Sequence, residues 1–145
     1  MRPGAATILV IAGFVLAASG ATRAALRGSL LVVANPDTPA LDESTLQRVY
    51  LGKVVEVDGR PIIPVNLPKG NVLRRTFMEQ VMTNDDEKYI AYWTVRRYIG
   101  QGTPPREFAT LEQQLEFVRT TPGAVGYADD SANVRQGLKV LLKKP

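Results

Sequence analysis

Four residues around the predicted start of a helix have the chemistry to hold an anion. Lys69 and Gly70 come just before Asn71, and Arg74 follows in the first helical turn. The free amides and the positive end of a helix N-terminus favour an anion, and arginine can bind phosphate through two hydrogen bonds. The same residues also fit a simpler interpretation, in which Asn71 caps the helix, Gly70 forms a turn and the basic side chains are solvated. The pattern leaves both interpretations open.

The chain contains no histidine and no cysteine. This excludes Ser-His and Cys-His nucleophiles, His-ligated zinc sites and disulfide support. The acidic run at 85–87 does not form a catalytic carboxylate pair, because successive residues of a helix do not face one another. Residues 129–131, Asp-Asp-Ser, are interpreted as a turn or helix cap rather than a metal site. We therefore expect no enzymatic activity, no metal and no cofactor.

The first 24 residues have the order of a secretory signal. Arg2 gives a positive start, residues 5–18 form an uncharged apolar run, and small residues follow. The run is shorter than the roughly 20 residues that a membrane-spanning helix needs. We predict a signal peptide over 1–24, with cleavage after Ala21 or Ala24. An uncleaved membrane anchor is the alternative.

The remaining segment, residues 25–145, has the composition of one globular domain. Of the 145 residues of the chain, 45% are hydrophobic and 22% are charged, which are ordinary values. The formal net charge is +4, and loss of Arg2 and Arg23 with the signal leaves +2. No nucleic-acid-binding motif accompanies the scattered basic residues, so no nucleic-acid partner is expected. We predict a periplasmic or secreted domain.

Apolar runs separated by turn residues predict the strands. Residues 30–35 (LLVVAN) are typical of a buried strand. Asp58-Gly59 between the runs 53–57 and 60–65 predicts a hairpin, because both turn positions need positive φ. The prolines of the second run suit an edge strand or a strand end. Further strands are predicted over 124–128 and 138–142.

Capping residues and apolar spacing predict four helices. Their order among the strands indicates one layered α/β domain, with a mixed sheet flanked by helices. In the third helix, acidic residues in the first turn and arginines in the last complement the helix dipole. The first predicted helix follows Asp42 or Ser44 and ends near Gly52, and the second covers 72–82 after the cap Asn71. The third covers 85–98, and the fourth follows the cap Thr110.

Aromatic residues cluster on the third predicted helix. They are Tyr89, Tyr92, Trp93 and Tyr98. Their spacing fits a ligand or partner surface, but it fits buried packing better. We therefore predict that this cluster belongs to the core.

Four segments, taken in order, carry a family resemblance. They are LLVVANP at 30–36, LQRVYLGK at 46–53 with the following DG, NVLRRTF at 71–77, and PGAVGYAD at 122–129. In this order they resemble phosphate-type periplasmic substrate-binding proteins of ABC transporters, and more closely the short single-domain relatives of that family. The segment at 92–105, YWTVRRYIGQGTPP, is similar to those short relatives too. The resemblance covers nearly all of residues 25–145 and implies a fold like one lobe of a type II periplasmic binding protein.

The sequence departs from that family in two places. It resembles only the lobe inserted in the middle, and the ligand loop of the first lobe has no counterpart here. The family reads Ser-Gly-Thr-Arg at the helix start that cradles phosphate, and residues 71–74 read Asn-Val-Leu-Arg. Arg74 matches the family's arginine, whereas Leu73 lacks the threonine hydroxyl. The resemblance therefore implies an anion site at Lys69, Gly70, Asn71 and Arg74 that is open on one side.

Two functional hypotheses follow. In the first, the chain is an exported phosphate- or oxyanion-binding domain that serves an ABC-type phosphate transport system as its substrate-binding component or accessory. In the second, it is a ligand-free periplasmic module that docks on a membrane sensor or transporter. A homodimer in which two copies face each other would rebuild a cleft under the first hypothesis.

Overall fold

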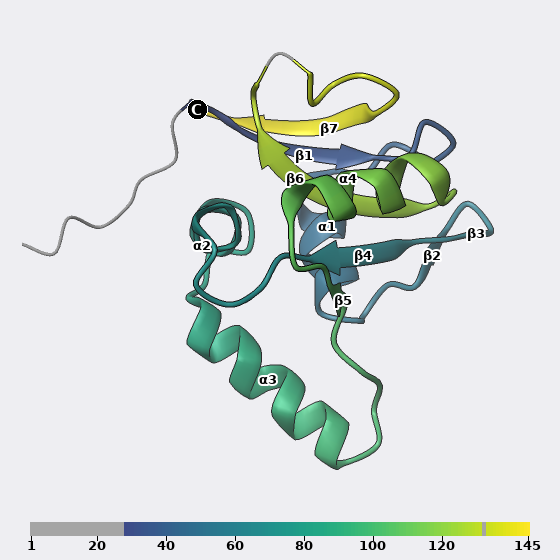
Figure 1. Ribbon diagram of the computed structural model, residues 1–145. Coiled ribbons are helices and arrows are strands. Elements are labelled where there is room, and N and C mark those ends of the chain that lie inside the picture. The colour runs from purple at the N-terminus through teal and green to yellow at the C-terminus, as the bar shows by residue number, and fades with distance from the viewer. Residues whose placement is uncertain (1–27, 132) are drawn as a thin grey trace, which may run out of the picture.

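The computed structural model describes residues 28–131 and 133–145. The predicted signal peptide over 1–24 and the predicted domain start at residue 25 lie outside these residues. Within them, helices cover both faces of a five-stranded mixed sheet, and a small two-stranded hairpin lies beside it (Figure 1). The α/β fold class and the mixed sheet flanked by helices are thus confirmed. No helix in the described ranges is long and apolar enough to cross a membrane.

The sheet has the strand order β5-β4-β6-β1-β7. β1 runs antiparallel to both of its neighbours, β6 and β7, whereas β4 runs parallel to β6 and β5. All five residues of β1 are fully buried, because β1 lies inside the sheet between β6 and β7 and helices cover both of its faces. The strands are β1 (Leu30–Ala34), β4 (Ile63–Asn66), β5 (Arg106–Glu107), β6 (Ala124–Asp129) and β7 (Lys139–Lys144).

Each of the four helices begins at a side chain that accepts a hydrogen bond from a backbone amide of the first turn. The caps are Asp42, Asn71, Asp85 and Thr110. Such a cap satisfies amides that otherwise lack a partner, and it is visible in the sequence, which is why the helix starts could be predicted. The helices are α1 (Glu43–Tyr50), α2 (Val72–Gln80), α3 (Asp86–Tyr98) and α4 (Leu111–Thr120).

Alternate residues of the sheet pack on opposite helix layers. Val32 and Tyr127 belong to the larger core, which α1, α2 and α3 cover. Leu31 and Val33 face the other side, where Leu115 of α4 packs. In Figure 1, α4 lies in front of the sheet and α1 behind it, while α3 extends away from the sheet at the lower edge of the molecule.

The predicted hairpin is present, but its second run, 60–65, is divided at Ile62 into two strands that belong to different sheets. β2 (Glu56–Val57) and β3 (Arg60–Pro61) flank Asp58 and Gly59, whose φ values of 51° and 73° are both positive. The prolines predicted an edge strand or a strand end. Pro61 does end β3, whereas an edge position is wrong for β4, which lies between β5 and β6. Pro64 is tolerated because β5 pairs only with the next two residues, so the missing N–H faces no β5 carbonyl.

The aromatic cluster of α3 is partly core and partly surface. Tyr89 and Trp93 are buried, as predicted, and Tyr92 is half-buried. For Tyr98 the prediction is wrong, because its side chain lies on the outer face of α3 and is 91% exposed. A second difference is β5, a two-residue strand that no sequence pattern predicted.

Candidate functional site

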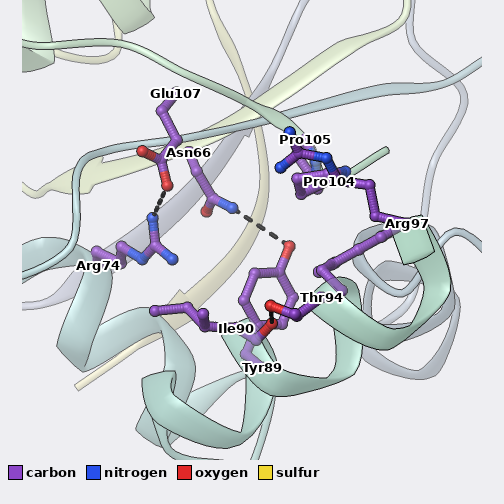
Figure 2. Close-up of a pocket in the computed structure, with 10 residues that line it drawn as sticks. Asn66, Arg74, Tyr89, Ile90, Thr94, Arg97, Pro104, Pro105 and Glu107 are labelled. Atoms are coloured by element: carbon purple, nitrogen blue, oxygen red, sulfur yellow. Dashed lines mark hydrogen bonds and ion pairs between the residues drawn. The ribbon is translucent and has the colours of Figure 1, made fainter. Parts of the chain in front are cut away.

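A cavity of about 140 Å³ lies where the parallel strands β4 and β5 end, beside α3. In open α/β sheets, ligands bind in the crevice outside the carboxyl ends of the strands. Asn66 and Glu107 are the last residues of their strands, and both line this cavity. Figure 2 shows the side chains of the lining residues, Asn66, Arg74, Tyr89, Ile90, Trp93, Thr94, Arg97, Pro104, Pro105 and Glu107.

Arg74 is the charged centre of the site, although its side chain is only 2% exposed. Its Nε and Nη2 atoms each lie 2.9 Å from Oδ1 of Asp86. Its Nη1 atom donates to the carbonyl oxygen of Leu67 at 2.8 Å and also to Oε1 of Glu107 (Figure 2). Burial lowers the pKa of Arg74, but the hydrogen bonds to Glu107 and Asp86 outweigh burial and raise it above the ordinary value. The guanidinium is therefore permanently charged and joins α2, α3 and β5.

A chain of hydroxyl and amide hydrogen bonds forms the floor of the cavity. Asn66 Nδ2 donates to the Tyr89 hydroxyl at 3.3 Å, and Asn66 Oδ1 accepts from the Tyr127 hydroxyl at 3.0 Å. The Tyr127 hydroxyl in turn accepts from the backbone amide of Leu67, and the Tyr89 hydroxyl donates to the carbonyl oxygen of Tyr50. Burial raises the pKa of Tyr89 to about 12 and also raises that of Tyr127. Both tyrosines are thus neutral at ordinary pH and hold Asn66 in one orientation.

Of the four residues predicted to bind an anion, Arg74 alone lines this cavity. Asn71 acts as the helix cap, since its Oδ1 accepts from the amides of Leu73 at 2.9 Å and Arg74 at 3.4 Å. Lys69 and Gly70 are exposed and line a separate hollow. The start of α2 therefore separates residues that are adjacent in the sequence.

This second hollow has a volume of about 290 Å³ and is predominantly acidic. Two basic residues, Lys69 and Arg75, face four acidic ones. An excess of negative charge opposes the approach of an anion. The acidic residues are Glu79, Asp85, Asp86 and Glu87.

Sequence reasoning assigned only Arg74 of this cavity to the site. Among the residues it missed are Asn66, Glu107 and Arg97. Asn66 ends a predicted strand, and a polar residue at that position is a weak signal for a site at a sheet edge. Glu107 comes from a strand of two residues that only its pairing with β4 defines. Arg97 was assigned to the last turn of α3 for its charge alone, and Figure 2 shows it at the cavity beside Pro104 and Pro105.

The two acidic partners of Arg74 differ in exposure. The side chain of Asp86 is 16% exposed, whereas that of Glu107 is 53% exposed. Glu107 therefore reaches the guanidinium from the solvent side. Because Arg97 lines the same cavity, exchange of this carboxylate for an external anion would place that anion near two arginines.

No protein-family model matches the sequence, and no curated protein matches it. Among solved structures, the chain is similar to an ABC-type phosphate transport receptor from Vibrio cholerae, with a TM-score of 0.59 at 16% identity over 78% of this chain and 45% of the other. It is also similar to a protein from Clostridium perfringens that is described as a phosphate ABC transporter substrate-binding protein and contains bound phosphate. The TM-score is 0.61 at 16% identity, over 78% of this chain and 44% of the other. A third similar structure is PstS from Borrelia burgdorferi, with a TM-score of 0.56 at 13% identity over 78% of this chain and 46% of the other.

These similarities concern the fold. The chain spans less than half the length of each of these three proteins. The resemblance to phosphate-type substrate-binding proteins is thus confirmed at the level of one lobe, and these neighbours are transport proteins rather than enzymes.

Proposed function

We propose that this chain is an exported single-lobe oxyanion-binding domain in which an inorganic oxyanion, such as phosphate, binds Arg74 by displacing Glu107. The observation that carries the proposal is the half-exposed carboxylate on Nη1 of an otherwise buried arginine. Carboxylates and phosphates bind a guanidinium in the same way. In this proposal the Glu107 carboxylate binds Arg74 when no oxyanion is present.

The surroundings of Glu107 support such an exchange. β5 has two residues and pairs with β4 alone, so few hydrogen bonds hold it. Asp86 would keep its two contacts with Arg74 while Glu107 turns into solvent. The cavity volume of about 140 Å³ equals roughly five water molecules at about 30 Å³ each. That volume suits a tetrahedral oxyanion.

In this proposal the four sequence-predicted residues have different roles. Arg74 binds the anion, and Asn71 fixes the helix turn from which Arg74 projects. Lys69 and Gly70 lie in the acidic hollow and contribute no ligand contact. The similarity to transport receptors and the predicted signal over 1–24 support a place outside the cytoplasm, next to a membrane transporter or sensor of phosphate-type systems.

A second function, the ligand-free interaction module, is favoured by the charge balance around Arg74. The arginine and its two carboxylate partners sum to a net charge of −1, which repels an anion. In that case Arg74 serves only to join α2, α3 and β5, and the lobe acts by docking on another protein.

Calorimetric titration with phosphate and with sulfate at low salt distinguishes the two functions. Glu107→Gln keeps the size of the side chain but removes its charge, so we expect at least tenfold tighter oxyanion binding than in the unmodified protein. Arg97→Gln changes an exposed residue of the same cavity, and we expect it to weaken binding several-fold. Lys69→Gln is the matched control outside the cavity, with no expected change.

Two outcomes of these titrations would contradict the proposal. If neither the unmodified protein nor Glu107→Gln binds either anion at millimolar concentration, the oxyanion proposal is wrong and the interaction module is favoured. If Lys69→Gln weakens binding as much as Arg97→Gln, the ligand lies in the acidic hollow and the assignment to the Arg74 cavity is wrong.

A further inference from the structure

The outer face of α3 carries an apolar stripe that no described residue covers. Tyr98 is 91% exposed, Val95 59% and Ile99, just after the helix, 55%. Together with exposed Ala91 they follow the spacing of one helix face. Single exposed apolar residues are normal, whereas three large ones at one helix end can serve as a contact surface.

α3 presents this stripe on a fixed support. On its inner side, Trp93 Nε1 donates to the carbonyl oxygen of Tyr50 at 3.2 Å, and the Tyr92 hydroxyl donates to that of Leu51 at 2.7 Å. A Cβ atom at Gly52 would lie 2.7 Å from the Trp93 ring, so the packing there is tight. Because the helix is already held in place, a partner that docks on its outer face need not order it.

The distribution of charge along α3 favours one kind of partner for the apolar stripe, a second copy of the same helix. The first turn is acidic and the last turn contains Arg96 and Arg97. Among the described residues, neither exposed Glu87 nor exposed Arg97 makes an ion pair. The acidic and basic ends of one helix are complementary to the basic and acidic ends of an identical antiparallel helix.

We propose that the outer face of α3 is a homodimer interface, in which α3 of a second copy packs antiparallel across a twofold axis. With the axis near the middle of the helix, Glu87 of each copy faces the region of Arg97 and Tyr98 of its partner. Ala91 and Thr94 then lie at the crossing point, where small side chains let two helices approach to about 8–10 Å. The contact is self-complementary, as a twofold interface requires.

This interface also concerns the Arg74 cavity, although it does not depend on anion binding. Thr94 and Arg97 line the cavity and border the apolar stripe. A second copy docked on α3 therefore lies beside the mouth of the cavity. One pair of helices buries less than the roughly 1,600 Å² of a standard interface, so we expect a weak, concentration-dependent dimer.

Sedimentation equilibrium of the purified full chain over a concentration series tests this inference. Val95→Asp places like charges across the interface, and we expect it to raise the dimer dissociation constant at least tenfold. Val55→Asp is the matched control, because Val55 is 69% exposed but lies outside α3; this variant should leave the dissociation constant unchanged. Glu87→Arg should weaken the dimer, and Glu87→Arg combined with Arg97→Glu should restore it.

Three results would overturn the inference. The first is a chain that stays monomeric up to about 1 mM, a weak-binding limit for specific association. The second is a dimer that Val95→Asp and Val55→Asp affect equally. The third is a monomer that binds vesicles of anionic phospholipid and loses this binding in Val95→Asp, which would assign the stripe to a lipid surface. Phosphate titration of Val95→Asp is a separate test of the oxyanion proposal, because Val95 does not line the Arg74 cavity.

Discussion

The two hollows on either side of Asp86 differ in how their charges are used. In the first, Arg74 is buried and its charge is matched by two carboxylates, one of which is open to solvent. In the second, Lys69 is exposed in acidic surroundings, beside a glycine with a φ of 88°. Lys69 and Arg74 are close in the sequence but lie in different surroundings. The comparison teaches that basic residues near one another in the sequence form a candidate anion site only where the fold buries the basic group and fixes its hydrogen-bonding partners.

The largest effect is expected from removing the arginine of the first hollow. Arg74→Met fills a similar volume but leaves the carboxylate of Asp86 buried without its partner. Breaking a buried ion pair in this way costs about 3–5 kcal/mol, and the solvent access of Glu107 places this case near the lower end. Urea unfolding measures the loss. A loss below about 1 kcal/mol would show that Arg74 does not join α2, α3 and β5.

The tyrosines that underlie the first hollow predict a loss of stability at high pH. The folded-state pKa of Tyr89 is about 12, above its ordinary value of 10.0, so the protonated hydroxyl favours the folded state. Its contribution of about 2–3 kcal/mol is fully present below pH 10 and is lost as the pH rises through 12.

Urea unfolding at pH 9 and pH 11.5 checks this prediction. Tyr89→Phe cannot ionise at this position and should lose less stability between the two values than the unmodified protein does. Equal losses in both proteins would mean that Tyr89 does not contribute to the alkaline transition.

Asn71 caps α2, the helix that carries Arg74, and its replacement should give an intermediate effect. Asn71→Ala removes the oxygen that accepts from the first-turn amides of α2, at a cost of about 1 kcal/mol. Asn71→Ser restores a capping oxygen and serves as the control. Thermal unfolding of the three proteins tests the expectation, which fails if serine and alanine destabilise equally.

The smallest effect is expected in the second hollow. Lys69 is exposed and makes no ion pair among the described residues. Lys69→Gln should therefore change the free energy of unfolding by less than about 0.5 kcal/mol, as is usual for surface substitutions. A loss comparable to that of Asn71→Ala would mean that the two hollows do not differ in the way described above.

Features of the fold that depend on neighbouring residues could be predicted from the sequence. The capping side chains act on amides two or three residues away, and the Asp58-Gly59 turn is set by its own φ values. β5 could not be predicted, because its two residues become a strand only by pairing with β4, 41 residues earlier in the chain. In this register Val65 pairs with Arg106 and Asn66 pairs with Glu107. Long-range pairing of so short a segment leaves no periodic signal.

Only part of the candidate site could be predicted from the sequence. Arg74 was proposed as an anion-binding side chain from its charge, its place at the helix start and the family resemblance, and it is the one proposed residue that lines the cavity. Its partner Glu107 lies 33 residues further along the chain, and no local rule connects the two. Asp86 was correctly placed in the first turn of α3, yet only the packing of α3 against α2 brings it to the guanidinium.

The position of β1 has a consequence for how the chain becomes structured as it is synthesised. β1 is the first strand of the described chain, and its two neighbours, β6 and β7, are the last two. β1 therefore has no hydrogen-bonding partner in the sheet until β6 has been synthesised, after β2 to β5 and α1 to α4. Pairing between such distant segments is slow, because a long loop must close first. A chain that stays open for this long suits passage through a narrow secretion channel before it folds, as the predicted signal over 1–24 would require.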